Sequence, residues 1–86
     1  MLKKLFGGFG GSKFLKRMNP LMELYAHSRN SEKTYQELLA LEPLIRTKGE
    51  RAMFNLNRAG ILYDMYRYRE AADIMREIPA LNPEFD

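Results

Sequence analysis

The chain of 86 residues contains no cysteine and only one histidine, His27. Without cysteine it has neither a disulfide framework nor a thiolate metal site. A single histidine does not assemble a histidine-rich metal centre, and no nucleophile–base pair or metal set accompanies it. We therefore expect no enzymatic activity, no metal and no cofactor. An intracellular, cytoplasmic location fits the lack of cysteine.

The sequence also lacks a long apolar run. A bilayer-spanning helix needs about 20 consecutive apolar residues, and the glycine-rich segment 7–13 interrupts the apolar N-terminal part of the chain. The apolar core and small-residue cleavage site of a secretory signal are missing too. The composition, 45% apolar and 29% charged, is that of a globular chain, and the length predicts one small domain.

Positive charge is concentrated at the N-terminus. Residues 1–22 carry five lysines and arginines and no acid, so a total net charge of +3 leaves −2 for residues 23–86. We predict a basic leader over residues 1–18 that combines these cations with four glycines and several Phe and Leu side chains. The residues expected at an anionic surface are Lys3, Lys4, Phe6, Phe9, Lys13, Lys16 and Arg17.

Two interpretations of this leader remain open. Lysines interspersed with Phe and Leu are typical of segments that lie on an anionic membrane surface. Alternatively, the leader is flexible and packs its apolar side chains on the helices that follow. Nucleic-acid binding is not expected, because the remainder of the chain has no net positive charge.

Residues 19–48 predict a first helical hairpin. Asn19–Pro20 is a favourable helix start, with asparagine as N-cap and proline at the first helical position. The polar segment 28–31 predicts a break whose asparagine or serine caps the next helix. Pro43 then stops or bends that second helix.

Residues 49–86 predict a second hairpin with a tight joint around residues 66–68. Its second helix has one apolar stripe, formed by Ala71, Ile74, Met75 and Ile78, and ends near Pro79. Its first helix has two apolar sides, so we expect it to be contacted from two directions. One predicted side comprises Ala52, Leu56, Ala59, Tyr63 and Tyr66, and the other comprises Phe54, Ile61 and Met65. Any side that the chain itself leaves uncovered predicts a homo-oligomer or a partner.

The second hairpin resembles a tetratricopeptide repeat. The carrying residues are Tyr68, Glu70, Ala71, Met75, Ile78 and Pro83, and Tyr66 occupies the usual place of the turn glycine. The resemblance implies an all-α fold in which two antiparallel helical hairpins form a domain over residues 19–86, preceded by the basic Gly-rich leader. It also implies a groove for a partner polypeptide, lined by Met53, Leu56, Asn57, Gly60, Tyr63 and Asp64.

Tyrosines near the joint allow two interpretations. Tyr63 and Tyr66 continue an apolar stripe, and Tyr68 is the usual joint aromatic of the repeat, which favours packing. Tyrosine next to arginine is also typical of contact surfaces. We therefore expect a non-enzymatic protein–protein interaction module, an adaptor that binds a peptide or helix of a partner protein. The alternative is a peripheral membrane-surface or assembly factor that acts through the basic leader.

Overall fold

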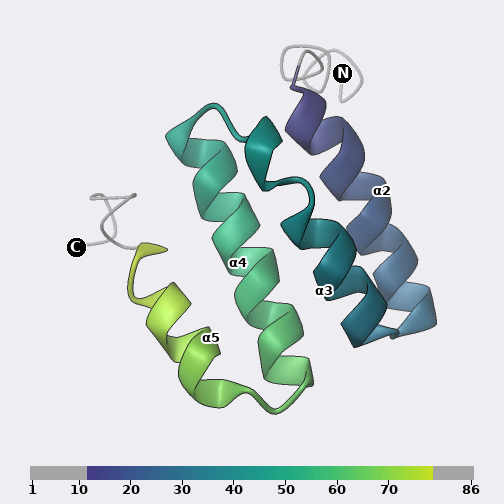
Figure 1. The fold of residues 1–86 in the computed structure, drawn as a ribbon, viewed down its shortest axis with the longest axis vertical. Helices are drawn as coiled ribbons and strands as arrows, with labels where there is room; N and C mark the ends of the chain where they lie inside the picture. The colour runs from purple at the N-terminus through teal and green to yellow at the C-terminus, as the bar shows by residue number, and fades with distance from the viewer. Residues whose placement is uncertain (1–11, 79–86) are drawn as a thin grey trace, which may run out of the picture.

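The computed structural model of the chain describes residues 12–78, which form helices and connecting turns without any strand. The helices are α2 (Lys13–Ser28), α3 (Ser31–Leu39), the short 3-10 helix η1 (Glu42–Leu44), α4 (Lys48–Asp64) and α5 (Tyr68–Met75). Consecutive α-helices run in opposite directions, and α4 lies between α3 and α5 (Figure 1). Helix α2 packs on α3 and also contacts α4. The predicted all-α class is confirmed.

Helix α2 begins at Lys13, so the predicted start at Asn19–Pro20 is wrong. Ser12 is the N-cap, and its hydroxyl accepts a hydrogen bond from the Leu15 amide at 3.0 Å. Pro20 therefore lies inside the helix. An internal proline costs roughly 3 kcal/mol, but the extra turns bury Phe14 and Met18 completely, at about 1.5–3 kcal/mol each. Burial of these two side chains thus offsets the free-energy cost of a proline inside the helix.

The other helix boundaries follow local signals closely. Helix α2 ends at Ser28, and its C-cap, Arg29, adopts a left-handed backbone with φ 54°. Asn30 then caps α3 through its side-chain oxygen, which accepts from the Lys33 amide, so the predicted break and cap are confirmed. Thr47 caps α4 in the same way, with its hydroxyl accepting from the Glu50 amide at 3.0 Å.

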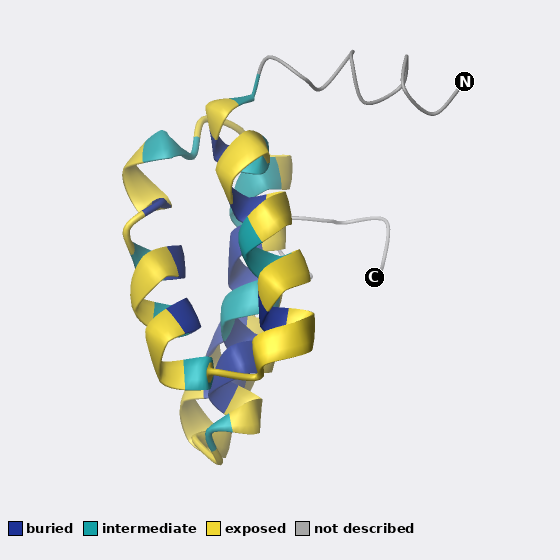
Figure 2. Cartoon of the chain, turned by 90° about the vertical axis from the view of Figure 1, so that its right-hand side faces the viewer, coloured by how far each residue is buried: buried dark blue, intermediate teal, exposed yellow. Residues whose placement is uncertain are grey.

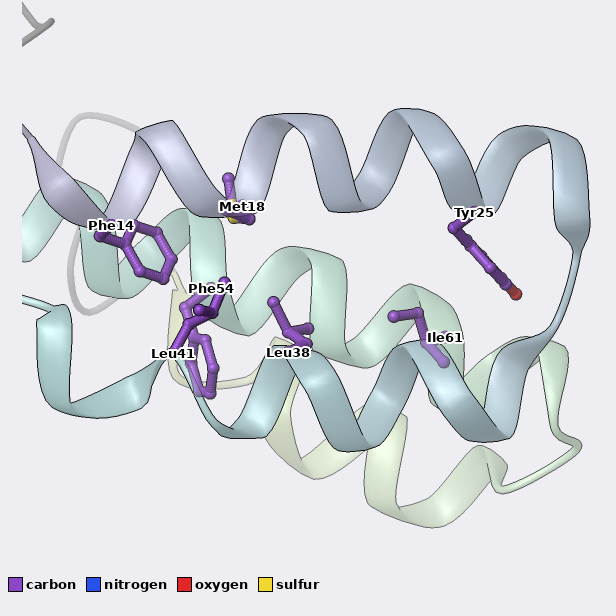
Figure 3. Close-up of a cluster of buried hydrophobic side chains, with 7 residues drawn as sticks. All are labelled: Phe14, Met18, Tyr25, Leu38, Leu41, Phe54 and Ile61. Carbon is purple, nitrogen blue, oxygen red and sulfur yellow. The ribbon is translucent and has the colours of Figure 1, made fainter.

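The main core lies between α2, α3 and α4. Its buried members are Phe14, Met18, Tyr25, Leu38, Leu41, Phe54 and Ile61 (Figure 3). The rings of Phe14 and Phe54 meet edge to face, with centroids 6.2 Å apart, a favoured aromatic geometry. This contact joins the first turn of α2 to the first half of α4, so two segments far apart in the sequence share one core.

A second, smaller core joins α4 to α5 through Ala59, Leu62, Ala71 and Ile74. Helix α4 is therefore contacted from two sides, as predicted, and Phe54 and Ile61 are buried. Leu56, Tyr63 and Tyr66 of the first stripe are exposed, so the chain leaves part of this side uncovered. Buried positions lie where the helices face one another, and exposed positions lie on the outside (Figure 2). The small side chains of Ala59 and Ala71 pack together with Leu62, and Leu56 and Tyr63 lie outside this core, where they are exposed.

Candidate functional site

One side of α4 remains open and apolar. Met53, Leu56 and Tyr63 are 41%, 53% and 61% exposed, and Gly60 is exposed as well. Their spacing of three, four and three residues places them on one side of a helix. We call Met53, Leu56, Gly60 and Tyr63 the outer side of α4. Four of the six residues predicted for partner binding thus lie together on the surface.

The other two predicted residues connect α4 to α2. Asn57 donates through Nδ2 to the sulfur of Met18 at 3.2 Å. Asp64 Oδ2 accepts the hydroxyl hydrogen of Tyr25 at 2.5 Å, and that hydroxyl also lies 2.9 Å from Ser31 Oγ. Both side chains therefore hold the helices together at the border of the outer side.

The hydroxyl of Tyr25 stays protonated over an extended pH range. Burial raises the pKa of Tyr25, and the hydrogen bond to Asp64 raises it further. Both effects disfavour the phenolate, which would be buried beside a carboxylate. The neutral hydroxyl is the form that donates to Asp64, so this link between α2 and α4 is stable at neutral pH.

Space above the middle of α4 is empty. A Cβ atom built on Gly60 would meet nothing within 4 Å, apart from the helix's own neighbouring backbone. An approaching chain can therefore come closer to the backbone here than at the flanking Leu56 and Tyr63. A small residue flanked by large apolar ones is a shape that a second helix or an extended segment fits.

Three tyrosines gather where α4 meets α5. The ring of Tyr68 lies edge to face with Tyr63 and with Tyr66, with centroid distances of 4.8 and 6.1 Å. Tyr68 is half exposed. It therefore packs as predicted only against the other two tyrosines of this surface cluster. The exposed fraction of Tyr66 is 78%.

The backbone of Tyr66 is strained. Its φ of 65° lies in the left-handed region, which costs a residue with a Cβ about 1–2 kcal/mol. The side chain recovers little of that cost by burial, because most of it faces solvent. The left-handed residue closes the C-terminal end of α4, because the Arg67 amide that follows it donates to the Leu62 carbonyl at 2.9 Å.

The outer side of α4 continues onto α5. Tyr68, Ala72 and Met75 are exposed, and their spacing places them on one side of α5. We call the combined surface the hairpin face, made of Leu56, Gly60, Tyr63, Tyr68, Ala72 and Met75. The sequence missed its α5 half because Met75 was assigned to the buried stripe. The spacing of seven residues between Tyr68 and Met75 is the signal that places both on one side of the helix.

A separate basic patch lies on the first turns of α2. Lys13, Lys16 and Arg17 are all exposed, and their spacing puts them on one side of the helix. The remaining predicted surface residues, Lys3, Lys4, Phe6 and Phe9, lie outside the described residues.

The start of α2 is tied to the start of α4 by Glu50. Its two carboxylate oxygens accept from the Ser12 hydroxyl and from the Arg46 amide, both at 2.7 Å. These two bonds, the Ser12 bond first, lower the pKa of Glu50 below its ordinary value. The carboxylate form therefore fastens α2 to the loop before α4.

Within residues 12–78, no group of three or more His, Asp or Glu side chains is placed to hold a metal ion. None of the helices in this range is both long enough and apolar enough to cross a bilayer. Comparison of the chain with family models, curated proteins and solved structures finds no match.

Proposed function

We propose that the chain is a non-enzymatic adaptor that holds a segment of a partner polypeptide against the outer side of α4. The observation that carries this proposal is the exposure of Met53, Leu56 and Tyr63 on a helix whose remaining sides are covered. Large apolar side chains grouped on one exposed side are typical of interaction sites. Tyrosine and methionine suit such a site, because tyrosine dominates contact energies and methionine adapts its shape.

The finer architecture that we propose is of tetratricopeptide type. Support comes from Tyr66, whose left-handed backbone stands where these repeats usually have their turn glycine. In that arrangement the partner segment lies along α4, and the free Oδ1 of Asn57 accepts a hydrogen bond from its backbone. Gly60 lets that backbone approach closely, since no atom occupies the space above it.

The test uses the full chain as bait in a native extract, in three versions. Leu56→Lys places a charge in the middle of the outer side. Gln36→Lys places the same charge on the exposed part of α3, outside this surface. We expect the wild type and Gln36→Lys to retain the same polypeptide and Leu56→Lys to lose it. Equal retention by both variants, with circular dichroism showing both folded, would contradict the proposal.

A second candidate function is attachment to an anionic membrane surface. It is favoured by the exposed Lys13, Lys16 and Arg17 on one side of α2, since each cation near an anionic lipid surface contributes about 1 kcal/mol. These residues continue the basic leader, so leader and helix would act together in this role.

Vesicle sedimentation separates the two candidates. Removing residues 1–11 keeps the buried Phe14 and Met18, which a deletion through residue 18 would destroy. We expect this truncated chain and a Lys16→Glu variant to bind anionic vesicles less than the wild type, with Lys33→Glu on α3 as the charge-matched control. Equal sedimentation of all four proteins would exclude the membrane role and leave the adaptor proposal intact.

A further inference from the structure

The hairpin face has an ordered arrangement of side chains. Its centre is small, because Gly60 and Ala72 are each six residues from Tyr66 and so lie at about the same height on the antiparallel pair. Tyr63 and Tyr68 stand on the side of the joint, in ring contact. Leu56 and Met75 lie at the opposite end of the face. The face therefore has an aromatic end, a low middle and an aliphatic end.

We infer that this face binds the same face of a second copy of the chain, across a two-fold axis over Gly60 and Ala72. Such an axis reverses the direction of both helices, so the aromatic end of each copy meets the aliphatic end of the other. Tyr68 of one copy then lies against Met75 of the other, a favourable sulfur–aromatic pairing. A two-fold contact requires a self-complementary surface of this kind.

The amount of exposed surface suits a dimer. At roughly 200 Å² for one fully exposed tyrosine, the exposed parts of Tyr63 and Tyr68 together present about 220 Å². This is a little over a quarter of the roughly 800 Å² per partner that a standard interface buries. Leu56, Met75 and the neighbouring Met53 contribute further exposed apolar area, so the face suits a weak, reversible dimer.

Charge favours the same occupant. None of the six residues of the hairpin face is charged, so the face offers no charge to select an acidic or a basic peptide. The arginine nearest to Met75, Arg76, is paired with Asp73 of its own helix. The uncharged residues of the face itself therefore bring no like charges directly opposite one another when two copies meet.

The oligomeric state of the pure protein tests this inference. Ala72→Arg puts a long cation at the proposed axis, where two copies would bring the cations together. Ala26→Arg makes the same change at an exposed position of α2. In sedimentation equilibrium we expect the mass of the wild type and of Ala26→Arg to rise with concentration from 10.1 kDa towards twice that value. Ala72→Arg should weaken dimerisation by at least about tenfold, since apposed like charges are strongly unfavourable.

A cross-link tests the position of the axis. The chain has no cysteine of its own, and two cysteines form a disulfide only when their Cα atoms lie within about 7 Å. We expect Ala72→Cys to form a covalent dimer on mild oxidation and Ala26→Cys to remain largely uncross-linked. A wild type that is monomeric at every concentration, or equal cross-linking of the two cysteine variants, would overturn the inference.

The inference rests on the proposed function only in that both use the open side of α4, where a second copy and a partner segment would compete, and their tests fail separately. Sedimentation of the pure chain involves no other polypeptide, whereas the bait experiment reports retention of a foreign one. A monomeric wild type whose bait still loses its partner in Leu56→Lys would refute the dimer and keep the adaptor. A dimer whose bait retains nothing that depends on Leu56 would refute the adaptor alone.

Discussion

Two adjacent residues of α4 reverse the usual relation between polarity and burial. Asn55 is 2% exposed, and Leu56 beside it is 53% exposed. The same helix therefore has an inner side, where Phe54 and Ile61 are fully buried, and an outer side of equally apolar residues in solvent. The side chains of the two sides differ little in hydrophobicity. They differ in whether a neighbouring helix covers them, which makes the outer side a surface available for contact.

The comparison predicts very different responses to truncation of the two sides. Phe54→Ala should reduce the free energy of unfolding by about 3–5 kcal/mol, because it leaves a cavity in the main core. Leu56→Ala, two positions along, should change it by less than about 0.5 kcal/mol. Urea unfolding followed by circular dichroism measures both, at protein concentrations low enough to keep the chain monomeric. Comparable losses in the two variants would show that the outer side is covered in solution.

Loss of the hydrogen bond between Tyr25 of α2 and Asp64 of α4 should give the next largest change in stability. Tyr25→Phe removes the hydroxyl that donates to Asp64, and should cost about 1–3 kcal/mol because the acceptor is charged. Tyr63→Phe removes an exposed hydroxyl from the outer side and should leave the free energy of unfolding within about 0.5 kcal/mol of the wild type. Thermal unfolding of the two variants side by side measures the difference. A neutral Tyr25→Phe would mean that the link to Asp64 does not stabilise the fold.

Features that depend on neighbouring residues could be predicted from the sequence, and features that depend on distant contacts could not. Helix caps and breaks depend on neighbouring residues, so the Asn30 cap and the break before it were predicted correctly. The start of α2 depends on the distant partner Phe54, which packs on Phe14, and the local signal of Pro20 pointed elsewhere.

The candidate site was predictable in part for the same reason. Periodicity identified two apolar sides on α4 and correctly required contact from two directions. It did not show which side α5 would cover, because that depends on the close packing of small residues such as Ala59 and Ala71. The α5 half of the hairpin face was missed because Met75 was assigned to the buried stripe, whereas Leu56 and Tyr63 were named through the resemblance.

A small gain in stability is expected in the middle of the outer side. Gly60→Ala adds a methyl group into open space and restricts the unfolded chain, so it should stabilise the helix by about 0.5–1 kcal/mol. Gly49→Ala in the first turn of α4 is the control, where a Cβ would lie 3.9 Å from the Thr47 hydroxyl and the gain should be smaller. A loss of stability in Gly60→Ala, measured on the monomer by urea unfolding, would show that this space is occupied.

The smallest expected effect is a loss of stability at low pH. The pKa of Glu50 is lowered in the folded chain, so its contribution to stability is present above the ordinary pKa and is lost as the pH falls through the folded value. We expect the stability of the wild type to decrease as the pH is lowered below about 4.5 and Glu50→Gln to show a weaker decrease. Glu23→Gln, an exposed change on α2, should retain the wild-type dependence. Identical pH profiles for the wild type and Glu50→Gln would rule out this contribution.

The central position of α4 has a consequence for synthesis on the ribosome. Phe14, Met18 and Leu38 emerge before the residues of α4 that cover them, since Phe54 and Ile61 come later in the chain. The apolar sides of the first two helices are therefore not fully covered until residue 61 has left the exit tunnel. The nascent chain is therefore most open to chaperones and to misassociation during this interval, and release of α4 from the exit tunnel ends it.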